Sequence, residues 1–331
     1  KINPIEHCNL HQSTNDVYPT ALKIASIYAV RELSESIAKL QGELQKKEKE
    51  FADILIIGRT EMQDAVPITL GGQFSSFAET IARDRWRTFK CEERLRTVNI
   101  GGTAVGTGLT APRKYIFLVI EKLRTNTGLG LTRADTLLDQ TANLDSFVEV
   151  AGIMSAHATN LIKIARDLRL LHFVHEINLP AVQAGSSIMP GKVNPVICES
   201  VISCGMKVLS NVQLISECVS QGTLQINEFI PLIAFALLES LDLMQNADLM
   251  FAKHIAGIIA NPEICRSHFE KDETLITAFL PLIGYDKAGE LLNEFHSMKA
   301  DNLIEFLKEK LGNELVDTTL SPSNLMSLGH R

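Results

Sequence analysis

The stretch Leu144-Asp-Ser-Phe-Val-Glu-Val-Ala-Gly-Ile-Met-Ser-Ala-His-Ala-Thr-Asn-Leu-Ile-Lys-Ile-Ala-Arg-Asp-Leu168 repeats apolar side chains three and four positions apart, which is typical of a helix. The same spacing extends over residues 133–172, with Asp135 as a candidate cap near the start. A single helix over that range would be about 60 Å long, because an α-helix rises 1.5 Å per residue. Such a helix exceeds the diameter of an ordinary globular domain, so the stretch predicts a bundle of long helices.

Segments on both sides of this stretch repeat the pattern. We expect further helices over 73–96, 112–125, 196–219 and 228–256, and one that begins after Pro19 and continues past Leu40. Residues 42–50 alternate in charge and predict the exposed end of that helix or a solvated segment. No alternating pattern of convincing length predicts a strand. The predicted fold is therefore all-α, a long-helix bundle, and helices that are apolar on several faces favour a symmetric homo-oligomer.

The character of the chain changes at Asn261–Pro262. Shorter and more charged helical segments follow, over 263–269, 273–280, 285–296 and 301–311. We therefore divide the chain into a central long-helix bundle domain, 1–258, which carries the candidate functional segments, and a small C-terminal helical domain, 259–331.

Composition excludes several classes of function. A net charge of −7 over 331 residues gives no electrostatic footprint for nucleic acid. No apolar run of the roughly 18 residues needed to span a membrane is evident, and no signal peptide is visible. The six cysteines form no C-x-x-C pair, so they predict reduced thiols in the cytoplasm and no metal site or cofactor. Lys1 opens the chain without an initiator Met, and we expect the sequence to begin inside a longer protein.

One segment departs from every helical preference: Gly185-Ser-Ser-Ile-Met-Pro-Gly-Lys-Val-Asn-Pro195, called here the signature loop. Asn194 followed by Pro195 is typical of an N-cap and the first helical position. The exposed N–H groups of such a helix start favour an anion, and Lys192 adds a positive charge. Ser186 and Ser187 add hydroxyls. The segment is either a ligand-binding loop or a simple connector between two helices.

Three other polar clusters interrupt the apolar periodicity. Residues 11–16 either cap the following helix or bind a ligand, and four small polar groups in a row exceed what a cap needs. Residues 58–67 form either a site or a turn in which Arg59 pairs with Asp64. Residues 99–109 contain four glycines but lack the G-x-x-x-x-G-K of a phosphate loop. That glycine-rich segment predicts close backbone approach to a ligand or to another helix.

Together these segments resemble the shared blocks of the fumarase/aspartase superfamily. The signature loop is similar to that family's signature over its whole length, and three further blocks occur in the family's order. The ending Leu320–Met326 resembles aspartate ammonia-lyases more than fumarases. The resemblance covers roughly the whole chain, and the three further blocks are Gln12–Asp16, Arg59–Thr60 with Gln63–Pro67, and Gly101–Leu109.

The resemblance implies homotetramers around a twenty-helix core, with each active site shared between three subunits. It implies reversible elimination of an amine or water from a succinyl dicarboxylate to give fumarate. We expect an ammonia-lyase acting on L-aspartate; the alternatives are a class II fumarase, which interconverts malate and fumarate, and a non-catalytic relative. We expect no cofactor, although some relatives respond to divalent cations, and nothing in the sequence locates a cation site.

The resemblance also implies residue roles. Ser186 would be the catalytic base that removes a proton beside a carboxylate. Preorganised donors must stabilise the charge that then accumulates on that carboxylate. The implied substrate-binding residues are Thr14, Asn15, Thr60, Lys192 and Asn194, and the implied supporting residues are Ser13, Ser187 and Glu199.

The chain departs from the family pattern at several positions. Glu61 stands where many relatives carry a His that touches substrate, and an acid there could hold an ammonium group, which favours an amine substrate. Asn3 also replaces a frequent His. Between Leu171 and Glu176 the chain lacks the usual Gly-rich segment, and the family's N-terminal domain is not found before Lys1.

Overall fold

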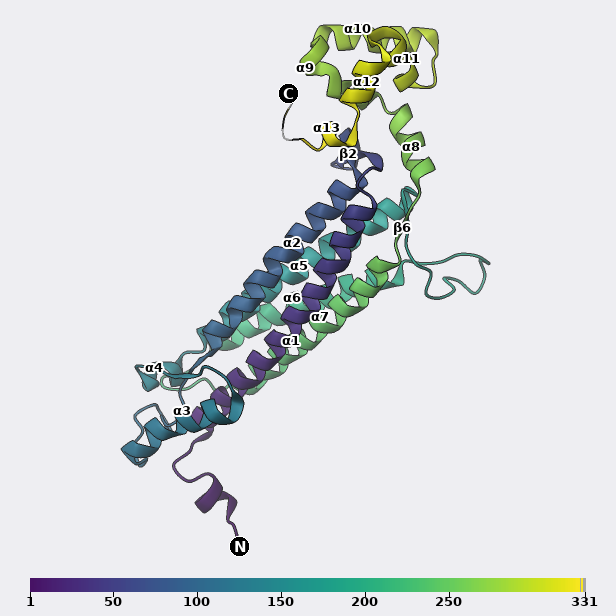
Figure 1. The fold of residues 1–331 in the computed structure, drawn as a ribbon. Helices are drawn as coiled ribbons and strands as arrows, with labels where there is room; N and C mark the ends of the chain where they lie inside the picture. Colours follow the sequence, from purple (N-terminus) through teal and green to yellow (C-terminus); the bar gives the residue numbers. More distant parts are fainter. Residues whose placement is uncertain (328, 330–331) are drawn as a thin grey trace. The chain divides into compact units, whose positions relative to one another are not determined.

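The computed structural model describes residues 1–327 and 329, and it is dominated by helices (Figure 1). The chain divides into two compact units: 1–40, 81–165 and 197–251 form the first, and 41–80, 166–196 and 252–331 form the second. Five long helices account for much of the described chain, and the predicted all-α long-helix bundle is confirmed. They are α1 (Thr14–Glu50), α2 (Leu70–Leu95), α5 (Asp145–Phe173), α6 (Val196–Ser220) and α7 (Ile230–Ala256).

In the first unit these helices pack side by side around an apolar core. Gly205 of α6 marks a close contact, because a Cβ there would lie 2.7 Å from Ile162 of α5. Between α6 and α7, the Asn211 amide donates to the Ser240 hydroxyl at 3.0 Å. Among the fully buried side chains are Ile27, Leu33 and Ile37 of α1, Phe147 and Leu161 of α5, Val208 and Ile215 of α6, and Ile233, Leu237 and Met244 of α7.

The prediction of one helix over 133–172 is wrong. The segment contains β4 (Thr132–Arg133), α4 (Leu137–Ala142) and then α5. Asn143 ends α4 in an extended conformation, and its side chain donates to Asp139 at 2.7 Å. Asp145 starts α5, where a negative charge suits the helix N-terminus. The apolar spacing continues through the break because side chains on both sides of it are buried.

Helix α1 also differs from its prediction. It begins at Thr14, before Pro19, and it includes residues 42–50. Lys47 is only 6% exposed, and its ammonium donates to the Ile258 carbonyl at 2.7 Å. Residues 42–50 are therefore the end of the helix, the first of the two predicted alternatives; Lys46, Lys49 and Glu50 are exposed there, whereas Lys47 is buried.

Three small elements complete the first unit. The short π-helix η1 (Pro4–Cys8) precedes α1, and α3 (Arg113–Thr127) follows the glycine-rich segment. Strand β3 (Thr97–Val98) pairs in parallel with β4.

The second unit contains a hairpin that the sequence analysis missed. Strands β1 (Leu55–Thr60) and β2 (Gln63–Thr69) pair antiparallel around a two-residue turn. Ile57 of β1 belongs to the same core cluster as buried residues of the C-terminal helices, including Phe279, Leu303 and Leu307. Strands β5 (Ile177–Asn178) and β6 (Ile259–Ala260) form a second antiparallel pair. The helices are α8 (Pro262–Lys271), the 3₁₀ helix η2 (Glu273–Phe279), α9 (Leu280–Ile283), α10 (Tyr285–Met298), α11 (Leu303–Leu311), α12 (Asn313–Thr319) and α13 (Pro322–Leu325). The proposed domain boundary at 258/259 stays a prediction.

Helix α7 is long and apolar enough, by length and composition alone, to cross a membrane. Its residues Ile233, Leu237 and Met244 are fully buried in the first unit. Because the core helix of a globular protein passes the same test, this is weak evidence for a span, and burial favours a core helix. The cytoplasmic location stays a prediction.

A buried ionic cluster joins four helices of the first unit. The His157 ring of α5 contacts Asp84 of α2 at 3.1 Å and Asp248 of α7 at 3.0 Å, and the Ser36 hydroxyl of α1 donates to Asp248 at 3.0 Å. Burial opposes the charged imidazolium, but the two carboxylates outweigh it and raise the pKa of His157 to about 10. The cluster therefore holds a cation between two anions in the core, and we call it the His157 clamp.

We predict that His157→Gln lowers the free energy of unfolding by about 3–5 kcal/mol at pH 7, because it removes the cation that pairs with the buried Asp248, while Asp84 keeps an ion pair with Arg87 at 3.2 Å. The folded-state pKa lies above the unfolded value of 6.5, so this stabilisation is complete below about pH 6.5 and is lost as pH rises through 10. Denaturant unfolding of both proteins at several pH values should show their difference shrinking toward pH 10.

His296→Gln is the matched control, because His296 pairs with Glu273 at 2.7 Å on the surface. That change should cost less than about 1 kcal/mol. Equal losses of unfolding free energy for the two variants would show that the His157 clamp stabilises the protein no more than a surface ion pair does.

Candidate active site

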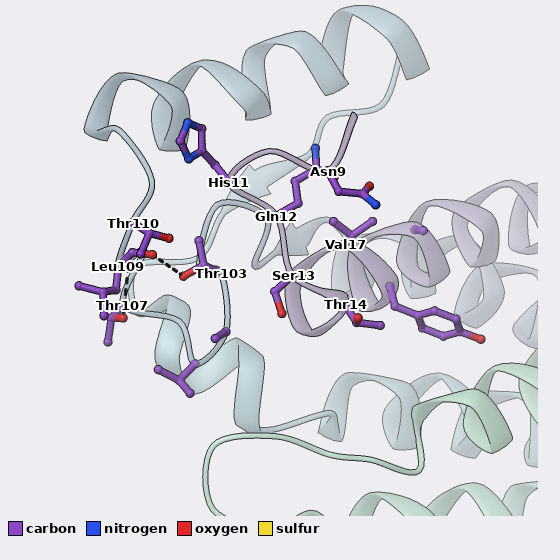
Figure 2. Close-up of a pocket in the computed structure, with 14 residues that line it drawn as sticks. Asn9, His11, Gln12, Ser13, Thr14, Val17, Thr103, Thr107, Leu109 and Thr110 are labelled. Atoms are coloured by element: carbon purple, nitrogen blue, oxygen red, sulfur yellow. Dashed lines mark hydrogen bonds between the residues drawn. The ribbon is translucent and has the colours of Figure 1, made fainter. Parts of the chain in front are cut away.

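The first unit contains a cavity of about 770 Å³ at the start of α1 (Figure 2). Ser13 and Thr14 line it from one segment, and Thr103 and Thr107 from the glycine-rich segment. Figure 2 shows the two segments with the Thr103 hydroxyl bonded to the Leu109 carbonyl, at 3.2 Å. Two polar blocks about 90 residues apart in sequence therefore meet at one cavity. The other lining residues are Asn9, His11, Gln12, Val17, Tyr18, Ala21, Ala104, Val105, Leu109 and Thr110.

Asp16 holds these two blocks together. It is fully buried, and its carboxylate accepts N–H groups of Ser13 at 2.9 Å, Gly101 at 3.0 Å and Thr103 at 3.0 Å. Burial raises the pKa of Asp16, and the backbone donors oppose that shift. Asp16 thus joins the segment that carries Thr14 to the glycine-rich segment.

Pro19 leads to a second connection between the start of α1 and the glycine-rich segment, made by Asn15 and Asn99. A proline inside a helix has no N–H for the carbonyl four residues earlier, which here belongs to Asn15. The Asn99 amide supplies the missing donor to the Asn15 carbonyl, at 2.9 Å. The Asn15 side chain donates in turn to the Ala104 carbonyl at 2.8 Å. Asn15 is therefore fixed at both ends, whereas Thr14 is exposed in the cavity wall.

The glycine-rich segment brings backbone close to backbone, as its composition predicted. Gly106 has a φ of +89°, and a Cβ there would lie 2.3 Å from the Leu138 Cα of α4. Only glycine fits both the angle and the space.

In the second unit, the signature loop is closed by its own backbone. The Gly185 N–H donates to the Lys192 carbonyl at 2.7 Å, and the Asn194 side chain donates to the Gly185 carbonyl at 3.2 Å. Helix α6 begins at Val196, as expected for the helix over 196–219 and one residue after Pro195, the predicted first helical position. Ser187 and Lys192 are exposed, while Ser186 and Asn194 are half-buried.

The Ser186 hydroxyl faces backbone donors. Its Oγ accepts the N–H of Ile188 at 3.2 Å and of Met189 at 3.1 Å. Donors aimed at this oxygen favour its deprotonated form. The loop can therefore stabilise a serine acting as a base.

Thr60 and Glu61 lie at the tip of the β1–β2 hairpin. Glu61 and Met62 have φ values of +49° and +64°, a conformation that normally selects glycine or asparagine. Such strained positions cluster at functional sites. The tip presents an exposed carboxylate on a turn of unusual sequence.

Arg59 anchors that hairpin. It pairs with Asp64 at 2.9 Å, which confirms the predicted turn pairing, and it also forms two hydrogen bonds to Glu176, at 2.9 and 2.6 Å. The Glu176 side chain is fully buried and also contacts His268 at 3.2 Å. Glu176 was not among the residues predicted from sequence; its position as an acid directly before the apolar Ile177 was the available signal.

The candidate residues fall into separate groups. Ser13, Thr14, Asn15 and Glu199 belong to the first unit, and the remaining six belong to the second. In the described part of the second unit, no hydrogen bond or ion pair joins the hairpin tip to the signature loop. The six are Thr60, Glu61, Ser186, Ser187, Lys192 and Asn194.

Over residues 1–327 and 329, no group of three or more His, Cys, Asp or Glu side chains is arranged to hold a metal ion. The prediction that the protein needs no cofactor remains a prediction.

Comparisons with known proteins give a consistent result. Residues 1–210 match a family model described as lyase. The chain is 39% identical to an aspartate ammonia-lyase of Pseudomonas canavaninivorans, over 98% of this chain and 70% of the relative. It superimposes on a crystal structure of fumarate lyase:delta crystallin from Brucella melitensis bound to cobalt with a TM-score of 0.92 and 38% identity, over 99% of this chain and 72% of that one. For a class II fumarase from Schistosoma mansoni the TM-score is 0.86 and the identity 30%, over 97% and 72% of the two chains.

The Arg59–Glu176 pair yields a stability prediction. Glu176→Gln should lower the free energy of unfolding by about 3 kcal/mol or more, because it removes a buried charge on which Arg59 and His268 converge. Asp64→Asn removes the exposed partner of the same arginine and should cost less than about 1 kcal/mol. Urea unfolding monitored by circular dichroism measures both, and equal effects would show that burial does not strengthen the Glu176 contact.

Proposed function

Because this chain belongs to the lyase family that contains the aspartate ammonia-lyases and fumarases, we propose that it catalyses the reversible elimination of ammonia from L-aspartate to give fumarate. The observation that carries the proposal is the complete signature loop, in a chain whose similarity to an aspartate ammonia-lyase extends over nearly its whole length. The substrate is then a dicarboxylate, and the reaction breaks a carbon–nitrogen bond.

In the proposed mechanism, Ser186 Oγ removes the proton from the carbon next to one carboxylate. The electron pair left on that carbon is delocalised into the carboxylate, and Lys192 and Asn194 stabilise the added charge. The pair then forms the carbon–carbon double bond as the amine leaves the neighbouring carbon with its own electron pair. The N–H groups of Ile188 and Met189 stabilise the Ser186 alkoxide that the first step requires.

Substrate placement is assigned to the other blocks. Thr14, which lines the 770 Å³ cavity, and the adjacent Asn15, whose amide would exchange its bond to the Ala104 carbonyl for the substrate, hold a carboxylate, with Ser13 in support. Thr60 supplies a further hydroxyl. Glu61 holds the ammonium group, and Ser187 and Glu199 support the signature loop and the start of α6. In line with the family resemblance, we propose that active sites are shared between the subunits of a homotetramer.

The decisive assay offers L-aspartate and L-malate separately and follows fumarate by its ultraviolet absorbance. Fumarate from aspartate alone supports the ammonia-lyase. Fumarate from malate alone would replace the proposal with the alternative, a class II fumarase, which the resemblance to the Schistosoma mansoni enzyme makes the second candidate. Fumarate binding without turnover of either would indicate a non-catalytic relative.

Ser186→Ala should abolish turnover, by at least about 100-fold, since it removes the base. Ser187→Ala is the matched control, because it removes a neighbouring exposed hydroxyl from the same loop. Steady-state rates of both variants, with folding checked by circular dichroism, distinguish the roles. Retained activity in Ser186→Ala would refute the proposed base.

Glu61→Gln should raise KM for L-aspartate, because the amide keeps the shape but loses the attraction for an ammonium group. Truncating a charge-assisted contact costs about 1.5–3 kcal/mol, which corresponds to a rise of roughly 10- to 150-fold. An unchanged KM would remove Glu61 from the substrate site.

Exposed aromatic and aliphatic side chains on the bundle support the tetramer. Trp86 and Phe89 of α2 are 65% and 66% exposed, and Phe235 of α7 is 65% exposed. Large exposed apolar surfaces usually mark protein contacts. Size-exclusion chromatography with light scattering should give four times the subunit mass, and Trp86→Ser with Phe89→Ser should lower it. A monomer for the unaltered protein would contradict the proposal.

A further inference from the structure

The second unit contains a cavity of about 660 Å³ that the proposed chemistry does not use. It is lined by basic and apolar side chains from the end of α5, together with His175 and Pro195, and no carboxylate lines it. Its volume lies within the range of small-molecule sites. The lining residues on α5 are Arg166, Arg169, Leu170, His172 and Phe173.

The two arginines of this cavity have no partner among the described residues, since neither takes part in any hydrogen bond or ion pair there. Arg59 and Arg94, by contrast, reach carboxylates at 2.6 and 2.7 Å. Residues three apart on a helix lie on the same face, so the Arg166 and Arg169 side chains start from neighbouring positions. Two like charges are thus placed together without a counter-charge.

Capping of α5 does not account for these arginines. The N–H of His175 donates to the His172 carbonyl and that of Glu176 to the Leu171 carbonyl, both at 3.0 Å. His175 has a φ of +63°. This pattern is a Schellman motif, with a histidine where glycine is usual. The backbone itself satisfies the last carbonyls, so the guanidinium groups are free for another role.

A third histidine adjoins the cluster. His254 is 5% exposed, and its Nε2 atom has no hydrogen-bond partner among the described residues. Burial, and then the positive charge of His172, lowers the pKa of His254. His254 does not line the cavity, but the influence of His172 on its pKa shows that positive potential from the cavity wall extends into the core.

We propose that this cavity binds a small oxyanion with at least two negative charges, held by Arg166 and Arg169 and flanked by His172 and His175. The planar fork of arginine matches carboxylate and phosphate oxygens bidentately. Leu170 and Phe173, which are 40% and 79% exposed, supply an apolar wall for the rest of such a ligand. Neither Ser186 nor Thr14 lines this cavity, although Pro195, the last residue of the signature loop, forms part of its wall.

The test measures thermal stability of the whole chain with inorganic phosphate, and separately with malonate, at constant ionic strength. Ligand at ten times its Kd raises the folded-to-unfolded ratio about elevenfold. The double variant Arg166→Gln, Arg169→Gln should lose that shift. The double variant Lys253→Gln, Lys271→Gln, which removes two exposed charges of the same unit outside the cavity, should keep it.

The two probes separate the ligand classes. A variant-sensitive shift with phosphate alone assigns a phosphate-bearing ligand, and one with malonate alone assigns a dicarboxylate. Equal rises in melting temperature for the unaltered protein and both double variants would indicate a general ion effect and would overturn the proposal. The absence of a rise with either probe would also overturn it.

A second measurement uses the unaltered protein, in case the arginine variant folds poorly. Phenylglyoxal modifies accessible guanidinium groups, and peptide mass spectrometry reports the extent at each arginine. Phosphate or malonate should protect Arg166 and Arg169 several-fold, while Arg266 in the same unit stays unprotected. Equal labelling with and without both anions would refute the site.

Discussion

The first unit depends on a cation held between two anions in its apolar core. Long helices with continuous apolar stripes can slide past one another by a turn at little cost, since one aliphatic layer resembles the next. The His157 clamp removes that freedom, because burial is tolerable only when the imidazolium meets both carboxylates. Ser36 and Asn160 complete the satisfaction of the two acids, at 3.0 Å from Asp248 and 2.8 Å from Asp84. We infer that the clamp sets the register of α1, α2, α5 and α7.

The register of α1 matters for the candidate site because the polar block starts that helix. The Asp16 carboxylate must accept the Gly101 N–H, and the Asn15 carbonyl, which lacks a helical donor because of Pro19, must accept the Asn99 amide. Both connections use backbone groups, which tolerate little displacement. The site is thus positioned by Asp16 and Asn99, which touch no reacting atom in the proposed mechanism, while the side chain of Thr14 remains free at the cavity.

Much of this was accessible from sequence, because periodic burial and loop composition report directly on local structure. The spacing around Phe147 identified α5, and the glycines near Gly106 correctly indicated close backbone approach. The helix break at Asn143 was missed because apolar spacing records burial and continues across a change of axis. The hairpin was missed because Glu61 and Met62 occupy a turn where glycine is the usual signal. Polar residues within apolar stripes, such as His157 and Lys47, gave no sign of partners that lie far away in sequence.

The candidate site was predictable only where chemistry is local. The signature loop could be recognised because its residues are contiguous, and its two N–H donors to Ser186 lie two and three residues away. Glu176 could not be assigned in this way, because its partner Arg59 is 117 residues distant. A single sequence records such a pair as two unrelated charges.

The wide spacing of the His157 clamp also bears on biosynthesis. Ser36 and Asp248 are 212 residues apart, so the clamp cannot close until α7 has left the ribosome. At about 5–20 residues per second, α1 waits roughly 10–40 s for its partner. During that interval α1, α2 and α5 expose apolar faces, and His157 lacks the second carboxylate, Asp248. The nascent chain is therefore a natural client for chaperones that shield helical surfaces until synthesis of the bundle is complete.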